Sequence, residues 1–598
     1  MKVLITTALE PTQTDMGDTV YLGEWCRVTE DSDDWSKPNY SVIPHHWDDR
    51  TKLRHDYIYL KELHLSLLQS LTKALNTFHK INRPLRYWRI ILDPWLLTYV
   101  AVVFDRWECL RKAFKENNAL NIIKIEKTPQ KTAPLNCANF HNLVQDEYWN
   151  YNLFSEIINK EYLRQCGIKK ISISLKKEKS KIQHSRQNKV FSTRIKNILR
   201  KIAKITDNVL GKVATRNPVV FYKSYFPLLP FLRLNLSLFQ LPRFYKAEFQ
   251  ELGSEERPYI PHYSQNERAK IVLNQKSKSH FECFLLSRII KDIPIVYLEG
   301  FQISRAQVDL IPEKPKLILT ANGYWINDLF KLWAAENVFN GCKLALIQHG
   351  GSLTQGSMFA FDFEENISDN FITWSQPCHS KHVRLSPTKL IGFRPKKSSK
   401  KYCSLIGCEW PRYAFRIQAS PISGQTLRHY RQAIRFYHFL KPEIKEKFRV
   451  KPYENQGWNL RQRFIDDIGM NKVYEKQCFN HVLSMSRVVV VTYPETAFSE
   501  SMLSGLPTIL LYPCNLWELH PFMQPLLTTL KKSKIAFHNS KAAAFHLNSI
   551  WNHADLWWRS PDVLVAREKF KRIAVDTKKD WLKQWKDFIS EKTDKTLV

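Results

Sequence analysis

Short apolar runs that end at polar residues recur along the chain and predict buried strands. They fall at residues 3–6, 293–298, 317–320, 343–347, 448–451, 488–491 and 507–511. Segments with apolar positions at helical spacing lie between them, at 281–290, 329–338, 432–440 and from Thr496 onward. Strands that alternate with helices of this length form βαβ units, so we expect an α/β fold with parallel sheets.

The first 120 residues show longer helical patterns. Leucines recur at helical spacing over residues 52–79, which predicts an amphipathic helix that covers a sheet. A second helix is predicted around residues 95–114, after Pro94, which a first helical turn tolerates. The apolar run 90–104 contains Asp93 and is shorter than the roughly 18–20 residues of a membrane span. We interpret it as a core helix.

The length and the repeated pattern predict two Rossmann-like domains. A chain of 598 residues is too long for one hydrophobic core, because cores stop growing near about 250–300 residues. The polar stretch 396–402 separates the two blocks of alternating pattern, which gives an N-terminal domain of residues 1–395 and a C-terminal domain of residues 396–598. Between about 165 and 216 the composition shifts to Lys, Arg, Ser and Gln, and we interpret this stretch as a basic insertion on the N-terminal domain.

The net charge changes the list of possible partners. At +33, the surface attracts nucleotide phosphates, anionic lipid headgroups or nucleic acid. No zinc pair, RNP-like stretch or recognition helix accompanies the charge, so a nucleic-acid partner is not expected. Within the insertion, the apolar positions between 195 and 213 share one helical face and basic residues occupy the rest. Such a helix either docks on an anionic inner-membrane surface or lies solvated on the protein, and the pattern favours neither.

The cysteines indicate the compartment. Eleven cysteines are scattered along the chain without a CxxC pair, which is typical of reduced thiols in the cytosol. The first apolar run is too short for a signal peptide. We therefore expect a cytoplasmic protein, peripheral on the inner membrane if the basic helix docks there.

The sharpest candidate for chemistry follows the apolar run 344–347, which leads directly into Gln348, His349, Gly350 and Gly351. Glycines at a strand end let backbone N–H groups approach a ligand closely, and the histidine can act as a base or contact a phosphate. The alternative is a histidine that only caps a turn.

A second candidate follows the apolar run 488–491. Thr492, Thr496 and Ser499 can cap a helix N-terminus or donate to a phosphate, and the amides there form an anion site. Glu500 lies inside that helix, where its carboxylate can accept hydrogen bonds from ribose hydroxyls. Ordinary N-capping explains the hydroxyls equally well.

Three further residues complete the predicted site. Lys451 ends a predicted strand and can neutralise a diphosphate or a sugar carboxylate. Asp48 and Asp49 are, with His349, the candidate bases. No Asp-x-Asp stands in a metal-binding context, so the sequence predicts neither a metal nor a cofactor, and the protein itself is expected to stabilise the leaving group.

Several of these blocks resemble a family of transferases encoded in bacterial lipopolysaccharide and capsule loci. The resemblance rests on residues 22–27 (LGEWCR), 44–50 (PHHWDDR), 86–90 (RYWRI), 104–107 (FDRW), 330–336 (FKLWAAE), 348–351 (QHGG) and 517–519 (WEL), with Thr492, Thr496 and Glu500. It implies a surface-polysaccharide transferase of GT-B-like architecture. The His-Gly and Lys-Pro elements are also similar to those of bacterial sialyl-, Kdo- and glycerophosphate transferases, whose donors are cytidine nucleotides. The chain departs from the family pattern at residues 352–354 and at Pro494 and Glu495.

The sequence thus predicts a glycosyltransferase that moves a sugar from a nucleotide-activated donor, such as a CMP-activated acidic sugar, to a glycan or lipid-linked glycan acceptor. The N-terminal domain is expected to bind the acceptor and the C-terminal domain the donor. Two alternatives stay open: transfer of a phosphate-linked alditol from a CDP donor, and a non-catalytic scaffold for polysaccharide assembly on the membrane surface.

Overall fold

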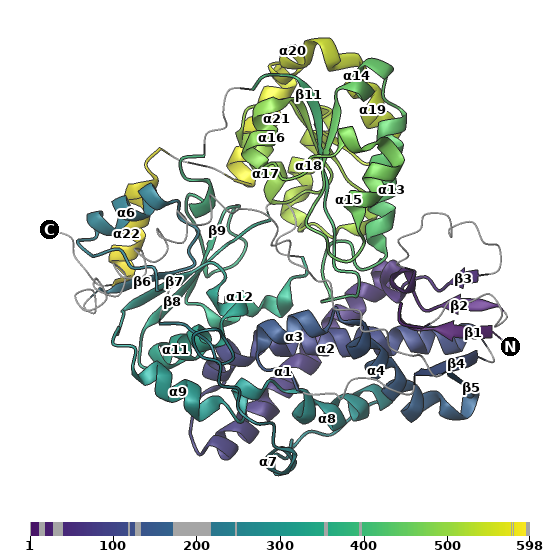
Figure 1. The fold of residues 1–598 in the computed structure, drawn as a ribbon. Coiled ribbons are helices and arrows are strands. Elements are labelled where there is room, and N and C mark those ends of the chain that lie inside the picture. The colour runs from purple at the N-terminus through teal and green to yellow at the C-terminus, as the bar shows by residue number, and fades with distance from the viewer. Residues whose placement is uncertain are drawn as a thin grey trace.

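The structure is a computed structural model of the chain. It describes residues 2–10, 18–27, 40–117, 120–125, 133–171, 217–245, 248–351, 357–393, 398–575, 577 and 579–593. The predicted basic helix between 195 and 213 lies outside the described residues. Three five-stranded parallel sheets organise the fold, each in its own part of the molecule (Figure 1). The predicted α/β class is therefore confirmed.

The first sheet is built by the first 171 residues, in the order β3-β2-β1-β4-β5. Its strands are β1 (Lys2–Ile5), β2 (Thr19–Tyr21), β3 (Tyr40–Val42), β4 (Leu120–Ile125) and β5 (Cys166–Ile171). This order matches the first five strands of the doubly wound Rossmann order 3-2-1-4-5-6. The edge strand β5 occupies the start of the segment that we interpreted as a basic insertion.

Two long helices form the centre of the molecule. α1 (Arg50–His79) and α2 (Leu85–Glu116) pack along each other and lie between the first and second sheets (Figure 1). α2 includes Pro94 in its interior, whereas we predicted that the helix starts after this proline. Among the described helices, α2 is the one long and apolar enough to cross a bilayer, but nearly all of its apolar window is buried inside the protein. The interpretation of 90–104 as a core helix is confirmed.

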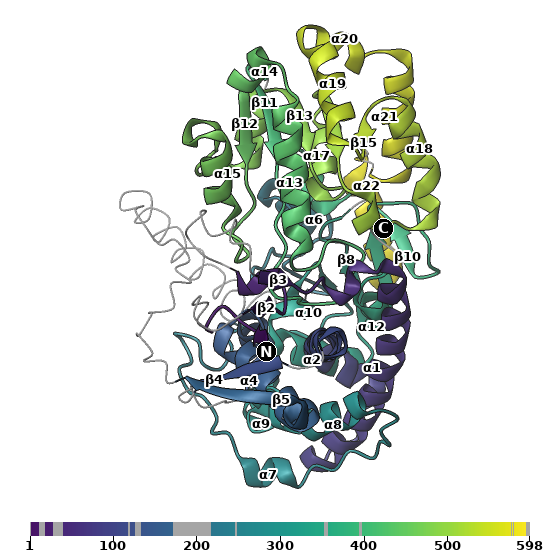
Figure 2. The same cartoon turned by 90° about the vertical axis from the view of Figure 1, so that its right-hand side faces the viewer.

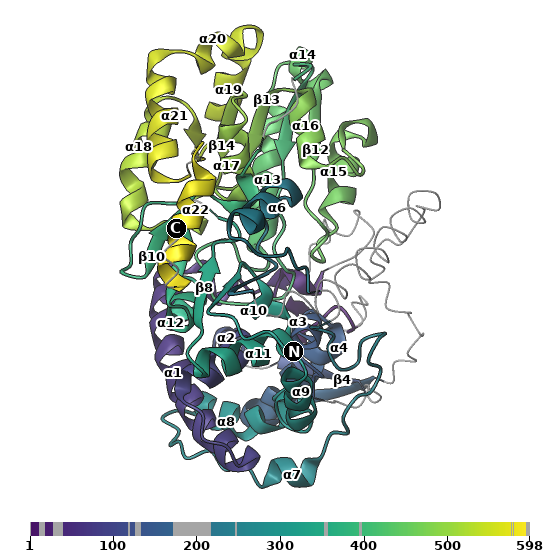
Figure 3. The ribbon, with the colours of Figure 1, turned by 90° about the vertical axis from the view of Figure 1, so that its left-hand side faces the viewer.

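The second sheet has the order β10-β9-β8-β7-β6. Its strands are β6 (Val219–Tyr222), β7 (Leu317–Thr320), β8 (Lys343–Ile347), β9 (Asn370–Thr373) and β10 (His382–Arg384). α11 (Asp328–Phe339) packs between this sheet and α2. α6 (Leu228–Ser237) and the C-terminal helix α22 (Trp581–Thr593) lie side by side on its outer side, and both face the viewer in Figure 3.

The third sheet has the order β12-β11-β13-β14-β15 and stands above the other two in Figure 2. Its strands are β11 (Tyr402–Ile406), β12 (Phe448–Lys451), β13 (Ser486–Val491), β14 (Thr508–Leu511) and β15 (Ala536–Phe537). The strand order reverses between β11 and β13. Ligands of doubly wound sheets bind at such a reversal, outside the carboxyl ends of the strands.

Shorter helices fill the remaining positions. Around the first two sheets these are α3 (Cys137–Leu143), α4 (Glu147–Ile157), α7 (Gln265–Ala269), α8 (His280–Asp292), α9 (Phe301–Asp309), α10 (Gly323–Ile326) and α12 (Phe363–Ile367). Around the third sheet they are α13 (Gln425–His438), α14 (Pro442–Glu446), α15 (Leu460–Ile468), α16 (Phe479–Met485), α17 (Thr496–Leu503), α18 (Gln524–Lys532), α19 (Ser540–Ile550), α20 (Ala554–Trp558) and α21 (Pro561–Ile573).

One predicted strand is wrong. Residues 293–298 contain a 3₁₀ helix, Ile295–Tyr297, in place of a strand. Pro294 fixes the backbone at the turn after α8, and the N–H groups of Ile295 and Val296 bond to the carbonyls of Pro134 and Leu135. Because the segment is buried and uniformly apolar, its pattern alone does not distinguish a strand from a tight helical turn.

Candidate functional site

A cavity of about 340 Å³ lies where the loop after β8 meets the loops after β11, β12 and β13. The second-sheet side is lined by His349, Gly350, Gly351, Met358 and Phe359. The third-sheet side is lined by Arg416, Gln418, Ala419, Ser420, Tyr453, Glu495 and Thr496. The cavity thus joins the carboxyl ends of two parallel sheets, at the point where the strand order of the third sheet reverses.

Gln348 fixes the backbone on the second-sheet side of the cavity. Its side chain is buried at the end of β8, where Oε1 accepts hydrogen bonds from the Trp374 N–H (2.6 Å) and the Thr373 hydroxyl (3.1 Å). Its Nε2 donates to the carbonyls of Gly350 (3.2 Å) and Gly351. One amide therefore ties β8, β9 and the glycine turn together, which directs the His349 side chain into the cavity.

The two glycines allow a close approach between the sheets. A Cβ atom on Gly350 would lie 2.6 Å from the Thr496 Oγ1, closer than real Cβ atoms come. The Gly351 N–H donates to the same oxygen at 2.9 Å, and Gly351 has a φ of +75°. We predicted that the glycine amides face a ligand. In this structure the Gly351 N–H instead donates its hydrogen bond to the hydroxyl of Thr496, the first residue of α17.

We predict that Thr496→Val lowers the free energy of unfolding by about 1–2 kcal/mol. The substitution keeps the shape of the side chain but removes the acceptor of the Gly351 N–H, and a lost hydrogen bond costs about this much when its donor stays buried. Urea unfolding measures the change. Thr496→Ser keeps the hydroxyl and is the matched control, so equal losses in both variants would contradict the role of the hydroxyl.

Burial and nearby cations set the protonation state of His349. Its half-buried ring is desolvated, and Arg416 and Lys389 add positive charge, which together lower its pKa to about 4. The ring is therefore neutral at pH 7. A neutral imidazole can accept a proton from a hydroxyl or donate one N–H to a phosphate oxygen.

Arg416 places a cation inside the cavity. Its Nε donates to the Gln418 Oε1 at 2.6 Å, and its guanidinium lies over the Phe359 ring at 5.1 Å from the centroid. Burial lowers the pKa of Arg416, while Glu495 and Glu364 act in the opposite direction. A guanidinium is the side chain best suited to pair with a phosphate or a carboxylate.

Glu495 also lines the third-sheet side of the cavity, at the N-cap position of α17. Burial raises the pKa of its carboxyl, and the attraction of Arg416 lowers it. The N-terminal end of α17 also faces the cavity, because both Glu495 and Thr496 line it. Backbone amides and the helix dipole at such an end favour an anion.

Four of the predicted donor-binding residues do not line this cavity. Thr492 is buried, and its hydroxyl donates to the Ile406 carbonyl at 2.9 Å. Ser499 is fully buried inside α17. Glu500 forms an ion pair with Lys389 (2.9 Å), one of the two cations that lower the pKa of His349. Lys451 ends β12, two residues before the cavity residue Tyr453.

Asp48 and Asp49 lie at a contact between the first and third sheets. Asp49 caps α1 by accepting the N–H groups of Thr51 and Lys52, and Asp48 pairs with Arg428 and accepts from Gln425 at 3.0 Å. The adjacent Arg50 donates hydrogen bonds to both carboxylate oxygens of Glu518. The motif at 44–50 therefore joins the N-terminal part to the 517–519 motif and does not reach the cavity.

Sequence reasoning missed Arg416, Gln418, Tyr453 and Glu495 as cavity residues. Arg416 and Gln418 belong to the loop after β11, a strand that the sequence analysis did not predict. The available signal was the short apolar run at residues 402–406, followed by a long loop that contains Gly407, Pro411, Pro421 and Gly424. Because ligands bind at the carboxyl end of such a first strand, recognising β11 would have pointed to this loop.

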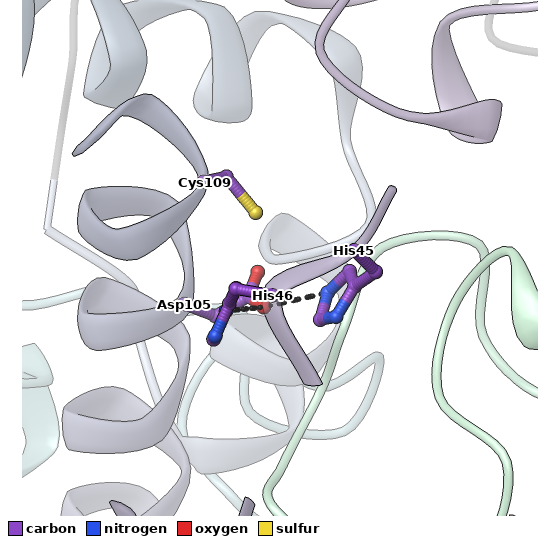
Figure 4. Close-up of side chains that lie close together, drawn as sticks. All are labelled: His45, His46, Asp105 and Cys109. Carbon is purple, nitrogen blue, oxygen red and sulfur yellow. Dashed lines mark hydrogen bonds and ion pairs between the residues drawn. The ribbon is translucent and has the colours of Figure 1, made fainter. Parts of the chain in front are cut away.

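One group of side chains in the described part of the chain has the composition and spacing of a metal site. His45, His46, Asp105 and Cys109 are buried, and their potential ligand atoms lie within 4.8 Å of one another (Figure 4). Both imidazoles point at Asp105, with the His45 Nε2 at 2.9 Å and the His46 Nε2 at 3.1 Å from Oδ1. This donor set would suit zinc.

The hydrogen bonds favour a different role for this group. The Trp47 N–H donates to the His45 Nδ1 at 3.1 Å, which leaves the His45 proton on Nε2, facing Asp105. Burial would raise the pKa of Asp105, but its contacts with His45, His46 and Arg106 hold the pKa far below its usual range. Arg106 then donates from NH1 to the Ala414 carbonyl at 2.7 Å, two residues before Arg416. The cluster thus anchors the loop that carries Arg416.

Comparison with known proteins identifies the family. A family model described as LIC12162 family transferase matches residues 2–589. The chain belongs to the LIC12162 family of transferases. No curated protein sequence matches this LIC12162 family transferase.

Similar solved structures include S. aureus MnaA with UDP, at 8% identity and a TM-score of 0.34, covering 63% of this chain and 96% of that one. The glycotransferase of kitacinnamycin is 10% identical with a TM-score of 0.30, covering 49% of this chain and 80% of that one. These TM-scores are too low for either structure to inform on the function of the LIC12162 family transferase.

Proposed function

We propose that this LIC12162 family transferase is a GT-B-type glycosyltransferase, which moves a sugar from a nucleotide-activated donor to a bacterial surface glycan in the cytoplasm. The observation that carries the proposal is the cavity between the second and third sheets, in which His349, Arg416 and Glu495 converge. Transfer of a glycosyl group needs a proton acceptor for the incoming hydroxyl and positive charge for the departing phosphate.

In this proposal the third sheet holds the donor. Its strand-order reversal supplies the crevice, Arg416 pairs with the leaving phosphate, and the N-terminal end of α17 adds backbone N–H groups. A CMP-activated acidic sugar is the donor that we favour, because its single phosphate and carboxylate are both partners for a guanidinium. Lys451, Thr492, Ser499 and Glu500 then support the donor side from behind the cavity wall.

The second sheet forms the acceptor side of the cavity. His349 extends from β8 toward the donor side and takes the hydroxyl proton or contacts the phosphate, as the sequence analysis proposed. Asp48 and Asp49 are less suited to act as bases, because both are engaged at the contact with α1 and α13. Glu495 is a further proton acceptor that lines the same cavity.

Two other functions are compatible with membership of the family. Transfer of a phosphate-linked alditol from a CDP donor would use the same cavity and the same Arg416. A scaffold without catalysis has less support, because a surface used only for docking has no need to bring an arginine, a neutral histidine and a carboxylate together in one cavity.

Thermal unfolding with a panel of nucleotides tests the proposal. A cytidine or uridine nucleotide at millimolar concentration should raise the melting temperature, because a ligand that binds the folded state stabilises it by mass action. Arg416→Gln should remove most of this shift, whereas Arg431→Gln, the same charge change at an exposed position of α13, should keep it. The proposal fails if no nucleotide shifts the wild-type protein.

The pH dependence of kcat/KM follows from the pKa of His349. The active form of a base is unprotonated, so it persists above its pKa and is lost as the pH falls through that value. With a pKa of about 4, His349 should not contribute an acid limb between pH 7 and 5, where an ordinary histidine near 6.5 would. Initial rates at donor concentrations well below KM, with saturating acceptor, measure the profile of kcat/KM against pH. An acid limb near pH 6.5 that disappears in His349→Gln would contradict the low pKa.

A further inference from the structure

α6 is apolar on the side that faces away from the protein as well as on the side that packs. Its inner face contributes Phe231 and Leu234 to the core of the second sheet, together with Trp585 of α22. Its outer face and the turn that follows expose Leu228 (59%), Leu229 (68%), Leu236 (66%) and Phe239 (84%). A helix with apolar side chains on two opposite faces is normally covered on both, and contiguous apolar surface marks an interaction site.

The backbone around α6 presents further aromatic side chains to solvent. Tyr225 (41% exposed) precedes the helix and Phe239 follows it, and both have a positive φ, of 62° and 53°. Bulky side chains rarely adopt this conformation, which costs free energy and persists where the surrounding structure holds it in place. The turns at both ends of α6 therefore extend the exposed apolar face.

The charged residues within α6 and the turns next to it are basic. Lys223 and Arg233 are the charged residues between 219 and 240, and no acidic residue lies in that range. The preceding segment, 169–216, is rich in lysine and arginine, with Glu178 and Asp207 as its acidic residues. Leucine and phenylalanine beside basic side chains form the pattern of surfaces that insert at the boundary of an anionic bilayer.

The position of this face relates it to the cavity. α6 follows β6, so its N-terminal end lies at the same edge of the second sheet as the loop after β8. β6 and β8 are separated by one strand, which corresponds to about 10 Å. The Tyr225 hydroxyl also accepts a hydrogen bond from Asn322, in the loop after β7, at 2.6 Å.

We propose that the outer face of α6, formed by Tyr225, Leu228, Leu229, Leu236 and Phe239, docks the protein on an anionic lipid bilayer. The leucine and phenylalanine side chains enter the acyl boundary, and Lys223 and Arg233 contact the headgroup phosphates. If the proposed glycosyl transfer is correct, this docking brings the acceptor side of the cavity to the bilayer surface, so the acceptor is a lipid-linked glycan.

Vesicle flotation of the full chain tests the proposal. The wild-type protein should float with vesicles of phosphatidylethanolamine and phosphatidylglycerol, and much less with phosphatidylcholine alone. The double variant Leu229→Ser, Phe239→Ser should lose at least about tenfold in binding, because each exposed apolar side chain that enters the bilayer contributes about a factor of ten or more. Leu310→Ser, Val272→Ser is the matched control, since these residues are 79% and 78% exposed elsewhere, and it should bind like the wild type.

Three results would overturn the proposal. The wild-type protein could fail to bind anionic vesicles, or the double variant could bind as well as the control, which would assign binding to the basic segment alone. Light scattering could also show a wild-type dimer that the double variant dissociates, which would make a second copy of the chain the occupant. Nucleotide stabilisation, measured on the same proteins, separates this proposal from the proposed function: vesicle binding without any nucleotide effect would contradict only the glycosyltransferase.

Discussion

His349→Ala should lower the rate of sugar transfer by about 10²–10⁴-fold, the range for loss of a positioned proton-transfer group. The side chain is half-buried at the end of β8 and lines the cavity, and no described hydrogen bond of the core depends on it. The variant should therefore fold and still bind nucleotide. The measurement is the rate of nucleotide release from the donor that the thermal panel identifies, with acceptor present.

The matched control for this variant is His438→Ala, which removes an exposed imidazole near the end of α13. It should leave the rate unchanged. If His349→Ala transfers sugar at the wild-type rate, His349 is not the base, and Glu495→Gln becomes the variant that should abolish transfer.

Asp105→Asn should lower the free energy of unfolding by about 3–5 kcal/mol, the range for removing one partner of a buried ion pair. The carboxylate accepts from His45, His46 and Arg106, and an amide cannot replace its charge. Arg106 is 1% exposed and would be left as a buried cation without its acidic partner. Urea unfolding measures the loss.

Two controls show whether this loss comes from a buried, hydrogen-bonded ion pair. Glu591→Gln breaks the surface pair with Lys592 and should cost less than about 1 kcal/mol. Treatment of the wild-type protein with EDTA should leave its unfolding midpoint unchanged, because hydrogen bonds hold the cluster in this account. A midpoint that falls with EDTA and recovers with zinc would instead make His45, His46, Asp105 and Cys109 metal ligands.

The sequence indicates the fold where strands are fully buried. The apolar runs at 317–320, 343–347 and 488–491 coincide with β7, β8 and β13, because strands covered on both faces need continuous apolar sequence. Strands of three residues, such as β2 and β3, carry too little pattern to be recognised. The longer strands β4, β5, β6 and β9 were missed as well, so the N-terminal half was predicted as one Rossmann-like unit, whereas it contains two sheets.

The candidate site was predictable to the extent that it follows predicted strands. His349, Gly350, Gly351 and Thr496 follow β8 and β13, and all four line the cavity. Arg416 comes from a long loop without periodic pattern, and its position depends on Arg106, more than 300 residues earlier in the chain. Long-range contacts of this kind have no signal in the local sequence. The roles of these residues in donor binding stay predictions.

A structure of the protein with the stabilising nucleotide bound tests the proposed site most directly. We predict that the phosphate lies in the cavity between β8 and α17, within hydrogen-bond distance of the Arg416 guanidinium and facing His349. A nucleotide bound at the carboxyl edge of the first sheet, or elsewhere outside this cavity, would contradict the proposed site.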